Sequence, residues 1–213
     1  MVNQSAATGE LRLCLRPPIP EIEEAAQLLD AAVSAHHEGR RNIAEELLVF
    51  TDNKRIWNWL DSVWGKRSPY TQFQVVPNAP LILPKEQRIK QRNPSIAERQ
   101  TIHERDGYYC RFCGIPVIRS DIRRKFSQAY PDVVLWGNTN DRQHAAFQAM
   151  WAQYDHILPH ARGGTNDISN IVLTCAACNY GRMRFTIEEV GLIDPRTREP
   201  RRGPWDGLER FRP

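Results

Sequence analysis

The sequence contains 213 residues, enough for one hydrophobic core of ordinary size or for a small domain beside another. Its 41% hydrophobic and 25% charged residues are typical of a soluble globular protein, and no apolar run approaches the roughly 20 residues of a membrane-spanning helix. The net charge of +4 is compatible with a polyanionic partner but too small to require one. The polar segment 1–10 lacks the apolar stretch of a secretory signal, so we expect a cytoplasmic protein.

The segment 20–65 has the pattern of three helices. Pro20 suits the first turn of the first helix and Gly39 its end, while a third helix is expected to start near Thr51 and to end at Gly65. The apolar positions of the three helices are Ile22, Ala25, Ala26, Leu29, Ala32 and Val33, then Ile43, Leu47, Leu48 and Phe50, then Ile56, Trp57, Leu60, Val63 and Trp64. Because such faces need a partner surface, we predict that residues 1–67 form a small helical unit.

The segment 68–94 is rich in proline and in basic residues. Phe73, Val75 and Val76 indicate an extended piece, and the prolines that follow exclude a long helix. Its basic residues are Lys85, Arg88, Lys90 and Arg92, against Glu86 alone. We interpret 68–94 as a linker, for which a solvated connector and a DNA-contacting arm fit equally well.

Shorter elements are predicted from residue 95 onward. Ser95, with Glu98 three residues later, has the spacing of a capping box and predicts a helix to about Asp106. Residues 154–158 and 171–173 have the pattern of two short strands with a Gly-Gly loop between them, and Cys178 opens a final helix to about Phe185. The tail 194–213 is expected to pack irregularly or to fray.

Four of the five cysteines form two Cys-x-x-Cys pairs, Cys110 with Cys113 and Cys175 with Cys178. In a reducing cytosol such pairs indicate metal thiolates before disulfides, and a redox pair or unligated thiols would not explain the duplication. Zn²⁺ favours four thiolates in a tetrahedron, so we predict a zinc site, whose role is structural because a closed site has no open coordination position. The fifth cysteine, Cys14, is interpreted as a small buried hydrophobe.

Polar residues at a characteristic spacing lie between the two cysteine pairs and directly after them. They are Asp155-His156, Gly163-Gly164, Asn170 before Ile171-Val172, Asn179 after Cys178, and Arg182 three residues further on. In this order they resemble the HNH endonuclease family, and the segment 105–114 looks like the family's entry to the first cysteine knuckle. The resemblance covers roughly residues 95–189 and implies an α+β fold, in which a helical N-terminal unit precedes a zinc-stapled ββα-metal HNH module at 95–193.

The chemistry of phosphodiester hydrolysis explains why these residue types occur together. It requires a deprotonated water, stabilisation of charge on phosphorus and help for the departing oxygen. The neutral imidazole of His156 can accept the proton of water, and oxygens of Asp155 and Asn179 suit Mg²⁺ or Mn²⁺. The resemblance implies that Asn170 braces the loop that holds His156, that Asp155 and His156 lie at the irregular end of a strand, and that the products carry 5′-phosphate and 3′-hydroxyl ends.

Each of these residues also has a plain structural interpretation. Taken singly, Asp155-His156 could be a surface turn, Asn170 a loop cap and Asn179 a helix N-cap. Their joint order inside a cysteine frame favours the catalytic interpretation. Candidate phosphate contacts are His160, Arg162, Arg182 and Arg184. His160 also fits a solvated loop residue or an auxiliary metal ligand. Each arginine also fits a solvated charged face.

Two features depart from the family's pattern. An insertion at about 118–151 separates the knuckles, with a basic cluster (Arg119, Arg123, Arg124 and Lys125) and a predicted helix through 144–151. It could shape a DNA groove, contact a partner or pad the core. Met183 stands where the family often has glycine, which could alter the final helix.

These observations predict a metal-dependent HNH endonuclease that acts on DNA, most simply double-stranded DNA, with phage defence or restriction as a candidate role. The alternative is a non-catalytic zinc ribbon that binds nucleic acid or protein. Residues 1–94 contain no recognisable DNA-reading motif, so a protein partner that binds the N-terminal helices is also predicted. No membrane association is expected.

Overall fold

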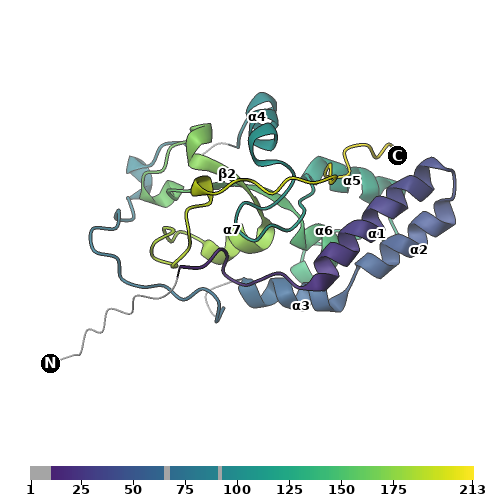
Figure 1. The fold of residues 1–213 in the computed structure, drawn as a ribbon, viewed down its shortest axis with the longest axis horizontal. Helices are drawn as coiled ribbons and strands as arrows, with labels where there is room; N and C mark the ends of the chain where they lie inside the picture. The colour runs from purple at the N-terminus through teal and green to yellow at the C-terminus, as the bar shows by residue number, and fades with distance from the viewer. Residues whose placement is uncertain (1–10, 65–67, 91–92) are drawn as a thin grey trace.

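The computed structural model describes residues 11–64, 68–90 and 93–213 (Figure 1). Its α-helices are α1 (Pro20–His37), α2 (Arg41–Thr51), α3 (Lys54–Val63), α4 (Ile96–Asp106), α5 (Ser120–Ala129), α6 (Ala145–Ala149) and α7 (Ala176–Arg182), and its strands are β1 (Ala152–His156) and β2 (Ile171–Cys175). Predictions that fall on residues 1–10, Gly65 and Arg92 lie outside the described residues. Within the described ranges, no helix combines the length and the apolar character needed to cross a bilayer.

Local signals account for where the helices begin. Pro20 occupies the first turn of α1, as predicted. In α4 the Ser95 side chain accepts from the Glu98 N–H at 3.3 Å and the Glu98 side chain accepts from the Ser95 N–H at 2.8 Å, so the predicted capping box is present. The third helix begins at Lys54 rather than near Thr51, because Asn53 caps it through the Arg55 N–H.

The N-terminal helices pack directly against the second half of the chain. Helices α1 and α2 lie side by side, and α3 contacts α6 and α7 (Figure 1). The approach at α7 is close, since a β-carbon on Gly181 would stand 2.8 Å from Val63 Cγ1 and 2.7 Å from Leu15 Cδ1. Buried residues of both halves therefore form one continuous hydrophobic cluster, in which the N-terminal helices support the back of α7.

The two strands form an antiparallel pair, with Asp155 opposite Val172 and His156 opposite Ile171. Strand β2 is buried along its whole length, and α7 follows it without a loop because Cys175 is also the N-cap residue of α7. The final helix is therefore 176–182 rather than the predicted 178–185. It ends at Arg182, and the next residue, Met183, has a φ of +53°, in the region that favours glycine, so the glycine that the resemblance implies at this position would fit the backbone.

The inserted segment and the C-terminal tail are part of the core. The predicted helix 144–151 is limited to α6, but its side chains are buried throughout. Phe126 of α5 stacks on Phe211 with ring centroids 3.8 Å apart, and Arg210 forms an ion pair with Asp30 of α1 at 2.6 Å. The tail is irregular, as predicted, and packs rather than frays.

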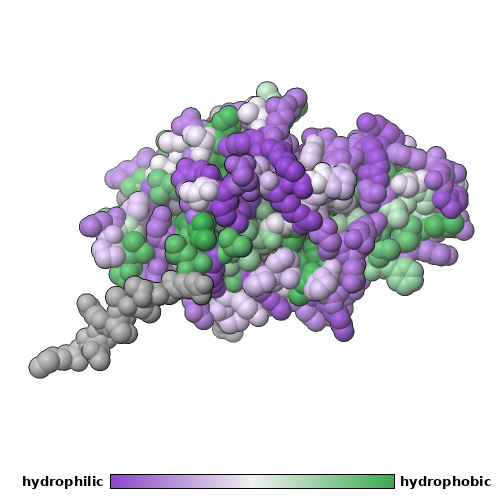
Figure 2. All heavy atoms as spheres, viewed as in Figure 1, coloured by the Kyte–Doolittle hydropathy of each residue, from purple (hydrophilic) through white to green (hydrophobic). Residues whose placement is uncertain are grey.

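The face shown in Figure 2 is mainly hydrophilic, with apolar side chains gathered in small patches. Helix α2 exposes Ile43, Val49 and Phe50, the last to 71%. These side chains are available to a partner, and the predicted protein partner of the N-terminal helices stays a prediction.

Candidate active site and metal centre

The four paired cysteines converge on one point. One sulfur from each of Cys110, Cys113, Cys175 and Cys178 lies within 4.8 Å of all the others, and the Cys113 and Cys175 sulfurs are 3.6 Å apart. A tetrahedral zinc ion with Zn–S bonds of about 2.3 Å would separate its sulfurs by about 3.8 Å, so the cluster has the size for such an ion. The four cysteines are thus placed to hold a metal, and an all-sulfur donor set favours zinc.

Each knuckle is shaped by its own backbone. In the first, Gly114 has a φ of +78°, and its N–H donates to the Cys110 carbonyl at 2.9 Å, which turns the chain beneath the metal position. In the second, the Cys178 N–H points at the Cys175 sulfur from 3.5 Å. Backbone N–H groups directed at sulfur suit thiolates, which supports the metal-bound form.

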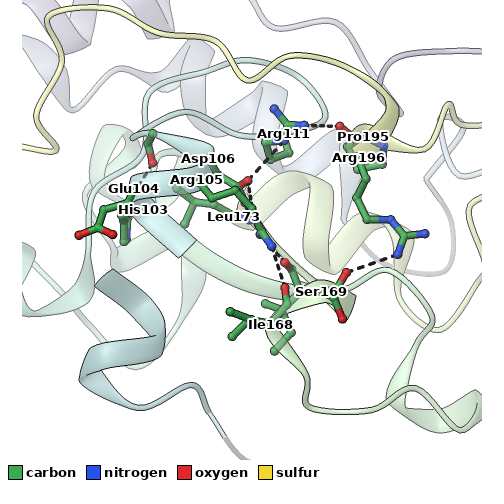
Figure 3. A network of polar contacts seen from close by, with 12 residues as sticks. His103, Glu104, Arg105, Asp106, Arg111, Ile168, Ser169, Leu173, Pro195 and Arg196 are labelled. Atoms are coloured by element: carbon green, nitrogen blue, oxygen red, sulfur yellow. Dashed lines mark hydrogen bonds and ion pairs between the residues drawn. The ribbon is translucent and has the colours of Figure 1, made fainter. Parts of the chain in front are cut away.

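A buried aspartate lies between Arg111 of the first knuckle and Leu173 of β2 (Figure 3). Asp106, 2% exposed at the end of α4, accepts two hydrogen bonds from Arg105, at 2.7 and 2.8 Å, and one from the Leu173 N–H of β2 at 2.9 Å. Arg111, beside Cys110, donates its own N–H to the Leu173 carbonyl at 2.9 Å. The first knuckle is thereby aligned along β2, which leads to the second.

Strand β1 and helix α7 border a cleft of about 530 Å³. Its wall includes Asp155, His156 and His160 from the β1 side, Asn179 and Arg184 from the α7 side, and Arg88 and Asn93 from the segment before α4. The cleft therefore brings together the predicted base and both predicted ligands of the catalytic ion. It has room for a hydrated cation and a phosphate group.

Asp155 is buried in the wall of this cleft and paired with an arginine. Its Oδ1 accepts from Arg182 Nη2 at 2.6 Å and its Oδ2 from Arg182 Nε at 3.1 Å. Burial raises the pKa of the carboxyl group, and the adjacent guanidinium acts in the opposite direction. A carboxylate oxygen accepts more than one bond, so an oxygen ligand for a cation remains available beside the arginine.

His156 ends β1 and is only 8% exposed. Its Nε2 lies 3.2 Å from Asn166 Oδ1. Burial lowers the pKa of the imidazole, which favours the neutral form that a base requires. Asp155 and His156 both pair regularly with β2, so the irregular strand end that the resemblance implied for them begins only after His156.

Asn170 braces the loop that follows His156. Its Oδ1 accepts from the Leu158 N–H at 2.9 Å, and its Nδ2 donates to the carbonyls of Leu158 and Thr165 at 3.2 and 2.9 Å. The loop closes so tightly that a β-carbon on Gly164 would stand 1.8 Å from the Leu158 carbonyl oxygen. Only glycine fits there, so the Gly-Gly motif has a steric cause.

Asn179 lies inside α7 rather than at its N-cap, which is Cys175. The Asn179 Nδ2 donates to Gln153 Oε1 at 3.3 Å, so the amide group uses its NH₂ in this bond and its Oδ1 is the atom that could act as a metal ligand. One carboxylate and one amide oxygen are a donor set that suits Mg²⁺ or Mn²⁺, which complete their shells with water and substrate oxygens. The residues present therefore fit a hard divalent ion.

Comparison with known proteins adds an independent finding. Residues 145–190 match the family model described as HNH endonuclease. No curated protein and no solved structure matches the chain. The matched residues, here called the HNH module, include α6, β1, β2, α7 and the second cysteine pair, and they indicate nuclease chemistry on a nucleic-acid substrate.

The structure corrects the prediction that Arg182 contacts phosphate. Arg182, 1% exposed in the HNH module, donates two bonds to Asp155 and three to the carbonyls of His156, Ile157 and Phe185. A guanidinium has five N–H donors, so all are used inside the protein. Arg182 fixes the end of β1 against α7 and has no donor left for a ligand.

The other candidate phosphate contacts differ in how deeply their side chains are buried. Arg162 is paired with Glu189 at 2.7 Å and donates to the carbonyls of Pro80 and Arg184, which makes it another internal brace. His160 lines the cleft, with its Nε2 2.5 Å from the Ile89 carbonyl oxygen. Arg184 is exposed at the cleft, and among the described residues its side chain has no hydrogen-bond or ion-pair partner.

Several residues of the cleft were not singled out from the sequence. Arg99 of α4 lines it and stacks over the Tyr154 ring, and Gln153 and Asn166 hold the amide of Asn179 and the imidazole of His156. Asn166 follows the Gly-Gly motif closely, which was the available signal. Arg99 gave none beyond its charge, because only the placement of α4 brings it to the cleft.

Proposed function

We propose that the protein is a metal-dependent DNA endonuclease and that the cleft of the HNH module is its active site, in a ββα-metal arrangement of β1, β2 and α7. The observation that carries the proposal is the shared cleft, whose wall contains His156 together with Asp155 and Asn179. An imidazole that shares a cleft with a carboxylate and an amide oxygen can supply a general base and protein ligands for a divalent ion, two components of phosphodiester hydrolysis. The match to the HNH endonuclease family supports the same reaction class.

In this proposal each side chain has a separate task. His156 takes a proton from the attacking water, and Asp155 and Asn179 provide the protein oxygens that hold the ion. The Mg²⁺ or Mn²⁺ ion that these oxygens would hold would supply positive charge near the reacting phosphate and the departing 3′ oxygen. Arg184, with Arg88 and Arg99, holds the substrate phosphates, and Asn170 keeps the loop after His156 closed.

The zinc cluster is a structural component of this proposal. Four thiolates fill a tetrahedral zinc ion completely, so the ion cannot bind water or substrate. It fixes the end of β2 and the first turn of α7, and therefore the position of Asn179.

One observation favours the alternative of a non-catalytic zinc ribbon. Both oxygens of Asp155 already accept hydrogen bonds from a buried arginine, as they would in a purely structural ion pair. A binding module would keep this pair and would not need a base at position 156.

A nicking assay on supercoiled plasmid with Mg²⁺ or Mn²⁺ separates the two functions. We expect cleavage by the wild type and a loss of about 10²–10⁴-fold in His156→Ala, the usual contribution of a general base. His37→Ala, an exposed histidine substitution in α1, is the matched control and should cleave normally. Equal cleavage by the wild type and His156→Ala, or none by either, would favour the binding module.

The assay should include linear double-stranded and single-stranded DNA, because the duplex is proposed as substrate. A role in restriction or phage defence is proposed on the sequence alone. Survival of host cells that express the wild type or His156→Ala, when challenged with phage, tests that role. Equal survival of both would contradict it.

A further inference from the structure

We propose that Asn166 is a positioning residue for His156 and that the proline-rich linker, through a backbone carbonyl, holds Asn166 in place. The inference rests on the proposed function, in which His156 is the base. It assigns the linker segment 80–90, here called the strap, to the active site rather than to a tether.

The strap runs along the loop that connects β1 to β2. The Leu83 N–H donates to the Ala161 carbonyl at 2.9 Å, and the Pro80 carbonyl accepts from Arg162. Arg88 of the strap donates back to the Leu83 carbonyl at 2.7 and 2.9 Å, which folds the strap on itself and leaves Arg88 on the cleft wall. The first two contacts join residues that are about 80 positions apart in sequence, and each involves a main-chain carbonyl.

Two successive carbonyls at the end of the strap reach the polar groups of the cleft. The Ile89 carbonyl lies 2.5 Å from His160 Nε2, and the Lys90 carbonyl accepts from Asn166 Nδ2 at 3.0 Å. A carbonyl oxygen can only accept a hydrogen bond, so each contact fixes the donor opposite it. His160 must carry its proton on Nε2, and Asn166 must direct its NH₂ group at the strap.

The orientation of Asn166 determines the tautomer of His156. With its NH₂ group facing Lys90, Asn166 presents Oδ1 to His156 Nε2 at 3.2 Å. An amide oxygen only accepts, so a neutral His156 carries its proton on Nε2 and has an unprotonated Nδ1. Without Asn166 the His156 ring would populate both tautomers and a wider range of orientations. In part of the protein Nδ1 would then carry the proton and could not act as the base.

The test combines a spectroscopic and a kinetic measurement on the full-length, zinc-loaded protein. Long-range ¹H–¹⁵N NMR correlations of the His156 ring report which nitrogen carries the proton, with His156→Ala used to assign the signals. We expect the Nε2–H tautomer in the wild type and a shift toward a mixture in Asn166→Ala. An Nδ1–H tautomer in the wild type would overturn the inference, and this measurement needs no folded variant of Asn166.

Kinetics then distinguish positioning from a merely structural role. Loss of an outer partner of a catalytic group typically costs about 10–100-fold, so we expect kcat of Asn166→Ala to fall by that factor with KM nearly unchanged. Asn166→Asp, which keeps an acceptor for Nε2–H, should recover part of the loss. Asn138→Ala, an exposed substitution in the insertion, is the matched control, and zinc content confirms that each variant is folded.

The outcomes separate this inference from the proposed function. If His156→Ala is inactive and Asn166→Ala keeps the kcat of the wild type, Asn166 does not position the base and the inference fails. If the wild type shows the Nε2–H tautomer but cleaves no nucleic acid, the hydrogen-bond network stands and the proposed function fails.

Discussion

Two buried aspartates, Asp106 beside β2 and Asp155 within β1, each accept two hydrogen bonds from one arginine. They differ in what else surrounds them. Asp106 receives the Leu173 N–H and is enclosed by protein, whereas Asp155 borders a cleft with an imidazole and an amide. Burial and an ion pair therefore do not by themselves identify a catalytic carboxylate. The proposal that Asp155 is catalytic depends instead on the imidazole and the amide that share its cleft.

The largest effect is expected from loss of the zinc ion, because both cysteine knuckles depend on it. Structural zinc in small cysteine sites contributes about 10–16 kcal/mol of binding free energy, which is also folding free energy. We expect Cys175→Ser, or removal of metal by a strong chelator, to release zinc and to unfold the strand pair with α7. Circular dichroism and metal analysis measure both. A chelated protein with an unchanged spectrum would show that the cysteine cluster is not a zinc site.

The comparison of the two aspartates is sharpened by making the same substitution in each. Asp106→Asn leaves the partly exposed Arg105 and the buried Arg111 without their counter-charge and should cost about 2 kcal/mol of unfolding free energy, measured in denaturant. Asp155→Asn should also destabilise, since Arg182 loses its partner. The cleavage rate of the folded protein distinguishes the two variants. We expect Asp106→Asn to keep kcat within about twofold and Asp155→Asn to lose at least about 100-fold. Equal rates in both variants would remove Asp155 from the proposed site.

Local signals in the sequence were sufficient for most of the elements. Pro20 and the Ser95–Glu98 capping box begin helices where they were expected, because these signals act within one helical turn. The paired cysteines converge as predicted, since four thiolates with that spacing have few other arrangements. The match of residues 145–190 to the HNH endonuclease family confirms the resemblance for that segment.

What the sequence could not reveal depends on contacts between distant main-chain atoms and on burial. The Lys90 carbonyl meets Asn166 across 76 positions, and a carbonyl has no residue type by which it could be recognised. Arg182 and Arg184 have the same side chain two positions apart, yet the first is enclosed and the second exposed. Arg182 is the last residue of α7 and faces the protein interior, whereas Arg184 follows the end of the helix. Only the three-dimensional packing therefore assigns their roles.

The smallest predicted effect tests this last difference. Arg184→Ala removes one exposed guanidinium at the cleft, and one lost phosphate contact should reduce the slope of log binding constant against log salt concentration by about 1. We expect KM for DNA to rise several-fold at physiological salt, with kcat and stability almost unchanged, because no internal bond of the Arg184 side chain is lost within the described residues. Arg182→Ala is the matched comparison and should lower the unfolding free energy instead, since five internal hydrogen bonds disappear. If Arg184→Ala binds DNA with an unchanged salt dependence, the phosphates do not contact Arg184, and the substrate path must then follow the other arginines that line the cleft, Arg88 and Arg99.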